Sequence, residues 1–175
     1  MLETLRITNY ALIDSVEIEF APGLNAVTGE TGAGKSILLG ALGLVLGARA
    51  ASESVRQGAQ RASVEAAFRI GEPSRRLRHV LDHHDIELED GVLLLARQVS
   101  PEGRSKAYAG GALVPLSVLA AIGDELVDLH GQHEHQSLLK TERQRELLDA
   151  YAGLEEQADA VGGMVAALRA RERAL

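Results

Sequence analysis

A glycine-rich octapeptide is the part of this sequence that most directly predicts chemistry. It has the spacing G-x-x-x-x-G-K-[ST], and its residues are Gly29, Glu30, Thr31, Gly32, Ala33, Gly34, Lys35 and Ser36. Glycines let the backbone turn tightly, so that its amides can point at phosphate oxygens. In such a loop the lysine reaches the β- and γ-phosphates and the serine hydroxyl holds Mg²⁺. We therefore predict that these eight residues bind a nucleoside triphosphate together with Mg²⁺.

The segments on either side of this loop support the prediction. Residues 24–28 have the composition of a strand and run directly into the glycines, and residues 35–46 are expected to form a helix that Gly47 closes. A helix that starts at the loop directs its positive end at a bound anion. Common GTPases read guanine with Asn-Lys-x-Asp, and neither Asn9 nor Asn25 begins that motif. ATP is therefore the predicted nucleotide.

The carboxylates that would complete a hydrolysis site are difficult to find. Hydrolysis requires an acidic residue after an apolar strand, to hold Mg²⁺ and orient water. The apolar residues 92–96 end in Arg97, and Asp128 follows only two apolar residues. The ABC-type signature Leu-Ser-Gly-Gly is also absent. The sequence thus predicts triphosphate binding without the recognisable second half of an ATPase site.

A histidine-rich stretch, HGQHEHQ at residues 130–136, follows an expected short strand at residues 125–129. Its three histidines do not share a simple helical face, which disfavours a zinc site but leaves one as an alternative. A solvated polar loop is the simplest interpretation. A sharper hypothesis is that Gln132, or alternatively Gln136, contacts Mg²⁺ or the attacking water near the γ-phosphate.

Composition limits the functional classes. The chain has 175 residues, of which 46% are hydrophobic, and a formal net charge of −7. The negative charge does not favour a general nucleic-acid-binding face, although three arginines and three histidines cluster at residues 75–84. That cluster is either a solvated helix face or a contact for DNA phosphates. The absence of cysteine excludes disulfides. Without a signal-peptide pattern or a spanning apolar segment, we expect a cytoplasmic protein with no membrane partner.

Alternation of apolar and polar residues predicts a series of short strands mixed with helices. The expected strands are residues 5–7, 16–20, 24–28, 64–70, 92–99, 105–109 and 125–129. The expected helices are residues 35–46, 73–83 and 116–122. This mixture around a phosphate loop indicates an α/β fold.

The character of the sequence changes at Thr141. Thr141 and Gln144 fit a capping box, which satisfies two free amides at a helix start. Apolar residues then recur at steps of four and three, at Leu147, Tyr151, Leu154, Ala158, Val161, Val165 and Leu168. This spacing is typical of a coiled-coil seam, and an ordinary amphipathic surface helix is the alternative.

Three stretches resemble the RecN family of bacterial DNA repair proteins. They are LRITNYALIDSVEIEFAPGLNAVTGETGAGKSILLGALGLVLGARA, VRQGAQRASVEAAF and DLHGQHEHQSLL. The family is similar to the structural-maintenance-of-chromosomes (SMC) proteins. The resemblance implies a P-loop ATPase head of ABC and SMC type. Residues 1–140 would form its N-terminal lobe, and residues 141–175 a helix leading into a coiled coil.

The resemblance also implies cofactors and partners. The cofactors would be ATP and Mg²⁺, with Gln132 as the Q-loop glutamine. The partners would be the C-terminal lobe of the same protein, which carries the Walker B and signature motifs, a second head joined through ATP as a homodimer, and DNA. The whole protein would hold or bridge DNA in double-strand break repair, in association with the nucleoid. One departure is the apolar segment 10–13, where relatives often have a basic residue, so no nucleotide contact is expected there.

Three other functions compete with this interpretation. A small-molecule kinase would require a lid and an acceptor site. A transporter ATPase would show its signature and Walker B motifs in one chain. A nucleotide-gated structural clamp would bind ATP without turnover.

Overall fold

This computed structural model describes residues 1–29, 32–50, 54–129 and 141–173. The chain divides into two units, Met1–Val127 and Asp128–Leu175, and each is described by itself. Within the described ranges, no helix combines the length and the apolar composition that crossing a membrane requires.

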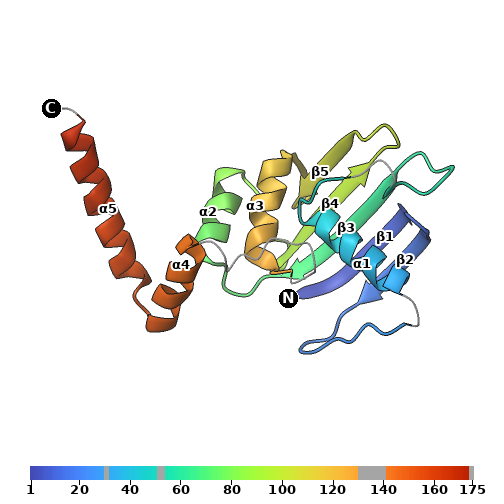
Figure 1. Cartoon of the computed structure of the whole chain (residues 1–175), viewed down its shortest axis with the longest axis horizontal. Helices are drawn as coiled ribbons and strands as arrows, with labels where there is room; N and C mark the ends of the chain where they lie inside the picture. Colours follow the sequence, from blue (N-terminus) through green and yellow to red (C-terminus); the bar gives the residue numbers. More distant parts are fainter. Residues whose placement is uncertain (30–31, 51–53, 130–140, 174–175) are drawn as a thin grey trace. The chain divides into compact units, whose positions relative to one another are not determined.

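The first unit is built on a six-stranded antiparallel sheet in the order β2-β1-β3-β4-β5-β6 (Figure 1). The strands are β1 Leu2–Tyr10, β2 Ile13–Glu19, β3 Ala62–Arg69, β4 Val92–Val99, β5 Ser105–Ala109 and β6 Ala112–Val114. Five of them confirm strands predicted from alternation, whereas the three-residue β6 is too short to give a periodic signal. The observed sheet and helices confirm the α/β class.

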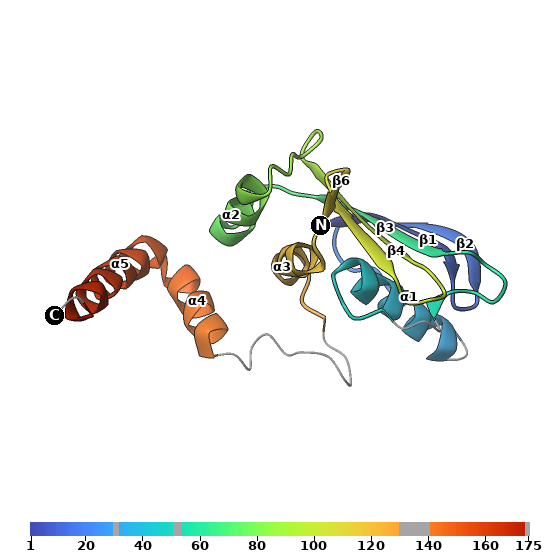
Figure 2. The same ribbon diagram turned by 90° about the horizontal axis from the view of Figure 1, so that it is seen from above.

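One face of the sheet carries the core. Alternate residues of β3 and β4 are buried because successive side chains of a strand point to opposite faces; they are Ala62, Val64, Ala66, Phe68, Leu93, Leu95, Arg97 and Val99. Helices α1 (Gly32–Val45) and α3 (Leu116–Leu126) lie against this face (Figure 2). The core therefore lies between the sheet and these two helices.

Helix α2 (Arg75–His83) packs beside α3 through its apolar side, where Leu77 and Leu81 are buried. Ser74 caps it, since the Ser74 Oγ accepts a hydrogen bond of 3.1 Å from the amide of Leu77. The same hydroxyl donates to Glu125 Oε2 at 2.8 Å and so ties α2 to α3. The arginines and histidines of residues 75–84 lie on the exposed side of α2, as expected for a solvated face. The alternative, a contact for DNA phosphates, stays a hypothesis.

Two expected strands are wrong for this chain. Residues 24–28 form no strand, and the side chains of Leu24 and Val27 are 97% and 52% exposed. Residues 125–129 also form none, because α3 continues to Leu126 and residues 127–129 belong to no regular element. A strand requires a neighbour for its backbone hydrogen bonds, and among the described residues neither segment has one.

The second unit contains α4 (Thr141–Ala152) and α5 (Glu155–Glu172). Helix α4 begins at the threonine of the predicted capping box. It ends before Gly153, whose φ of +65° is a left-handed conformation that terminates helices. The apolar seam is thus divided between two helices rather than carried on one, and its side chains are largely exposed. The coiled coil and the domain boundary at residue 140 remain predictions.

Candidate nucleotide site

The phosphate loop connects the exposed segment 24–28 to the start of α1. The Lys35 ammonium donates a hydrogen bond of 2.8 Å to the carbonyl oxygen of Gly29, so the lysine spans the loop from its last turn to its first residue. A Cβ atom added at Gly34 would meet nothing within 4 Å, which shows that the backbone there is accessible. The described ends of the loop are thus held together by the lysine, and the backbone at Gly34 is open to solvent.

The electrostatics of the helix start also favour an anion. The first turn of α1 contains no acidic residue, so within the described part of the loop no carboxylate lies at the positive end of the helix dipole. Ser36 is exposed near the start of the same helix, and a hydroxyl oxygen is the kind of ligand that Mg²⁺ takes. The described part of the loop thus fits both a triphosphate and Mg²⁺.

The end of β1 supports the middle of α1. Tyr10 is buried, and a Cβ atom at Gly40 would lie only 3.1 Å from the Tyr10 hydroxyl. The backbone around Tyr10 is held by hydrogen bonds from the amide of Ala11 to the Ser54 carbonyl, 2.8 Å, and from the amide of Arg56 to the Asn9 carbonyl, 2.9 Å. Tyr10 therefore positions the helix of the candidate site by packing against Gly40.

The other end of α1 is fixed against α3 by two glycines. Gly47 ends the helix with a φ of +101°, and a Cβ atom there would lie 2.6 Å from the Ala120 Cα. A Cβ atom at Gly123 would overlap the carbonyl oxygen of Leu46. Because these are backbone contacts, the residues that follow α1 approach α3 as closely as glycine permits.

Some predicted site residues lie outside the described part of the chain. These are Glu30 and Thr31 of the loop, and Gln132 and Gln136 with the neighbouring histidines. Gly32 and Ala33 are described as the first residues of α1. Asp128 is exposed at the start of the second unit. Within the described ranges, no group of three or more histidine and acidic residues could hold a metal ion.

Two structural features were missed in the sequence. Tyr10 and Gly123 support α1, and neither belongs to a motif. Arg97 is a buried cation inside the core, although the alternation of Leu93, Leu95 and Val99 already placed it on the inward face of β4. The signal was present, but the residue type argued against burial.

Comparison with known proteins places this site in a family. The sequence pattern described as "AAA domain" matches residues 4–160. The DNA repair protein RecN of Streptomyces coelicolor is 47% identical over 163 residues, which cover 93% of this chain and 27% of that protein. RecN of Vibrio cholerae is 44% identical over 153 residues, which cover 87% of this chain and 27% of that protein. The chain thus spans 27% of the length of these two relatives.

Solved structures show the same fold. An SMC ATPase, from work on ATP-driven dimerization and DNA-stimulated activation, superposes with a TM-score of 0.57 at 23% identity, covering 71% of this chain and 78% of the other. The recombination mediator protein RecF superposes with a TM-score of 0.54 at 18% identity, covering 68% of this chain and 29% of the other. These likenesses assign the fold to the P-loop ATPase heads of SMC type.

Proposed function

Because this chain belongs to the AAA domain family and matches the N-terminal part of RecN DNA repair proteins, we propose that it is the ATP-binding lobe of an SMC-like ATPase head. In this proposal the loop from Gly29 to Ser36 binds the phosphates of ATP. Lys35 contacts the β- and γ-phosphates, and Ser36 holds Mg²⁺. Bound ATP, together with its Mg²⁺, would supply the phosphate bond whose hydrolysis changes the conformation of the head.

The observation that carries the proposal is the exposed apolar segment in front of the loop. Leu24 is 97% exposed, although it precedes a phosphate loop that a buried strand normally supports. The turn before it is well formed, since the Asn25 side chain bonds both the amide and the carbonyl of Ala21, at 3.1 and 2.8 Å. A folded turn followed by an exposed apolar strand sequence is the expected appearance of a lobe that pairs with a second lobe.

Burial of this segment would also position the catalytic groups. Residues 24–28 would pair with a strand of the C-terminal lobe. The phosphate loop would then be held at its start by this strand and at its end by α1. The second lobe would then contribute the Mg²⁺-binding and catalytic carboxylates that this sequence lacks. Gln132 remains our predicted Q-loop residue, with Gln136 as the alternative.

For the whole protein we propose ATP-driven association of two such heads, which holds or bridges DNA during double-strand break repair and recombination. The solved SMC ATPase described above undergoes ATP-driven dimerization and is activated by DNA, and the relatives of this chain are DNA repair proteins. These properties support DNA and a second head as partners, and a location at the nucleoid in the cytoplasm. No described feature favours the small-molecule kinase or the clamp without turnover.

Substitution of Leu24 tests the pairing of the two lobes. We expect Leu24→Asp to weaken the association of residues 1–175 with a separately produced C-terminal lobe by about tenfold or more, because a leucine buried at the contact contributes about 1.5–3 kcal/mol. Titration calorimetry of the two pieces measures this affinity.

The matched control is Leu12→Asp. Leu12 is 78% exposed and lies in the turn between β1 and β2, so the same change there should leave the affinity unaltered. Equal affinities for the wild type and Leu24→Asp would contradict the proposed pairing.

A further inference from the structure

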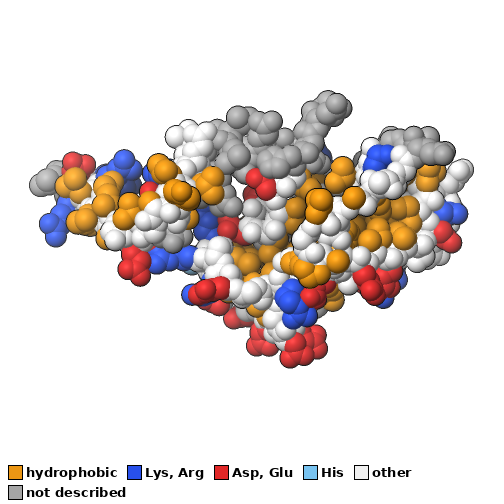
Figure 3. Space-filling view, turned by 90° about the horizontal axis from the view of Figure 1, so that it is seen from below, with side chains coloured by type: hydrophobic (Ala, Val, Ile, Leu, Met, Phe, Trp, Pro, Cys, Tyr) orange, Lys and Arg blue, Asp and Glu red, His pale blue; other side chains and the backbone are white. Residues whose placement is uncertain are grey.

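A short basic segment stands out in the first unit. Residues 75–84, which include α2, carry three arginines and three histidines against one aspartate, in a chain whose formal net charge is −7. Acidic side chains (red) are spread over the face of the molecule shown in Figure 3. A local concentration of cations on such a protein is the electrostatic feature that favours a polyanion.

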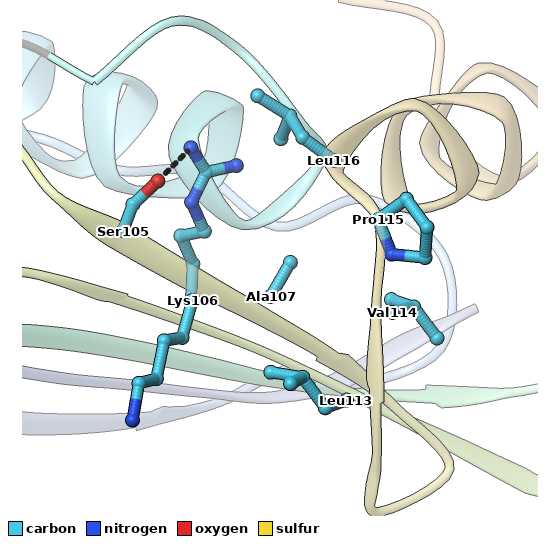
Figure 4. A pocket seen from close by; sticks show the side chains of 8 residues that line it. Ser105, Lys106, Ala107, Leu113, Val114, Pro115 and Leu116 are labelled. Atoms are coloured by element: carbon cyan, nitrogen blue, oxygen red, sulfur yellow. Dashed lines mark hydrogen bonds between the residues drawn. The ribbon is translucent and has the colours of Figure 1, made fainter.

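The position of an arginine decides whether its charge can reach a partner molecule. On the surface of the sheet, Arg6 forms a salt bridge of 2.8 Å with Glu17. Arg97 is 1% exposed, and it donates a hydrogen bond of 2.9 Å to the Ser105 hydroxyl, drawn as the dashed line at Ser105 in Figure 4. A carboxylate offsets the first charge, and burial removes the second from the surface. Neither cation is suited to a large external anion.

The cations of α2 lie on the side of the helix that faces away from the core. Leu77 and Leu81 are buried on the side that packs beside α3. Arg75, His79 and His83 follow one another at steps of four, and residues four apart share one helix face. The rings of His79 and His83 stack with their centroids 6.0 Å apart, as this spacing requires. The exposed residues Arg75, Arg76, Arg78, His79 and His83 together form the basic face of α2.

The first turn of α2 is charged against its own helix dipole. Arg75, Arg76 and Arg78 lie within the first four residues of the helix, and this turn contains no acidic residue. Cations are unfavourable at the positive end of a helix, where acidic residues are preferred. The carboxylate of Glu125 in α3 lies at this end and accepts the hydrogen bond of Ser74. Packing beside α3 therefore does not account for three arginines here, whereas a bound anion would compensate both the arginines and the helix dipole.

We propose that the basic face of α2 binds the phosphate backbone of duplex DNA. The inference rests on the proposed function, in which DNA is a partner of the whole protein, and it places that partner on a particular surface. Guanidinium groups donate paired hydrogen bonds to phosphate oxygens, and a neutral imidazole can donate one. The helix is about 13 Å long, and duplex DNA carries one negative charge per about 1.7 Å of its axis, so several phosphates can meet this face. Such contacts carry no sequence preference.

Removal of two of these arginines tests the proposal. Fluorescence anisotropy of a labelled DNA duplex of random sequence measures its affinity for the full-length protein between about 50 and 200 mM salt. We expect Arg75→Gln/Arg76→Gln to lower this affinity about tenfold or more at about 100 mM salt, because phosphate contacts are lost. Each lost contact removes about 0.9 from the slope of log affinity against log salt, so the slope should become shallower by about 2.

A charge-reversal variant separates DNA binding from folding. Arg75→Glu/Arg76→Glu places acidic residues at the positive end of α2, where they are favourable. We expect its midpoint of thermal unfolding to be no lower than that of the wild type, while its DNA affinity falls below that of the glutamine variant. If both α2 variants unfold at a lower temperature and still bind DNA as the wild type does, the arginines are structural and the proposal is wrong.

The matched control is Arg61→Gln/Arg104→Gln. Both arginines are exposed in the first unit outside α2, so this variant loses the same amount of charge. It should keep the wild-type affinity and slope. Equal losses in the two glutamine variants would show that only the net charge matters and would overturn the assignment to α2.

The outcomes separate this inference from the proposed function. DNA binding by the wild type with unchanged affinity in both α2 variants would overturn the inference and leave the proposed function standing. No binding of the duplex by the wild type would overturn the role of DNA in both. Poly-L-glutamate is the competing polyanion. If it binds the wild type as tightly as the duplex does, and both α2 variants lose it, the face receives an acidic protein segment and not DNA.

Discussion

Replacement of Lys35 by alanine is expected to abolish ATP hydrolysis by the full-length protein. The Lys35 ammonium donates a hydrogen bond of 2.8 Å to the Gly29 carbonyl at the other end of the loop, and we propose that it contacts the β- and γ-phosphates. Its loss removes positive charge from the place where negative charge develops in the transition state. We expect the turnover rate to fall by about 100-fold or more, the scale found when one such stabilising group is removed.

The fold should survive this change. Lys35 is partly exposed, and a single exposed hydrogen bond contributes about 1 kcal/mol or less to stability. Arg104→Ala, which removes a cation from the exposed turn between β4 and β5, provides the matched control and should keep the wild-type rate. Steady-state ATPase assays with circular dichroism compare the three proteins. Turnover near the wild-type rate in a folded Lys35→Ala variant would refute the role of the loop.

Replacement of Gly123 by alanine is expected to destabilise the first unit strongly. The added Cβ atom would overlap the carbonyl oxygen of Leu46, and a backbone atom cannot rotate away as a flexible side chain can. The segment that follows α1 must then move away from α3, which disturbs the end of α1 and its packing on the sheet. We expect the free energy of unfolding to fall by about 3 kcal/mol, at the upper end of the usual cost of overpacking. Chemical denaturation measures it.

Gly71→Ala is the control for this prediction. It adds the same methyl group within the same unit, but nothing lies within 4 Å of the added atom. The expected change is within about 0.5 kcal/mol, as for most exposed substitutions. If the two alanine variants are equally stable, the close contact of Leu46 with α3 is not the constraint that we infer.

Much of the first unit could be predicted from the sequence because its strands pair within the described chain. The alternation along β3 and β4 reflects one buried face and one exposed face, and both strands have neighbours on each side. The end of α1 could also be predicted, since the positive φ of Gly47 is a conformation that glycine favours.

The failures have a common physical cause. Residues 24–28 have the composition of a strand, yet the sequence pattern reports only a preference for burial and not the presence of a neighbour. The exposure of Leu24 shows that the neighbour is not among the described residues. The same reasoning applies to residues 125–129, where α3 takes the first two. The apolar pattern after Thr141 could not reveal the break at Gly153, because periodicity does not report backbone conformation.

The candidate site was predictable to the extent that it is a local motif. Lys35 and Ser36 belong to a spacing that has a direct chemical meaning, and the structure places both in the first turns of α1. Supporting residues such as Tyr10 and Gly123 are remote in sequence from the loop. They act through close packing that only three-dimensional contacts reveal.

The central claim is that this chain is one lobe of a composite ATPase head. It is tested most directly by measuring the rate of ATP hydrolysis against protein concentration, for residues 1–175 alone and for their mixture with the C-terminal lobe. The account predicts no turnover above background for the chain alone. It predicts restored turnover for the mixture, with a rate that rises more steeply than concentration as ATP joins two heads. Robust hydrolysis by residues 1–175 alone would contradict the account and would make Asp128 the first carboxylate to test.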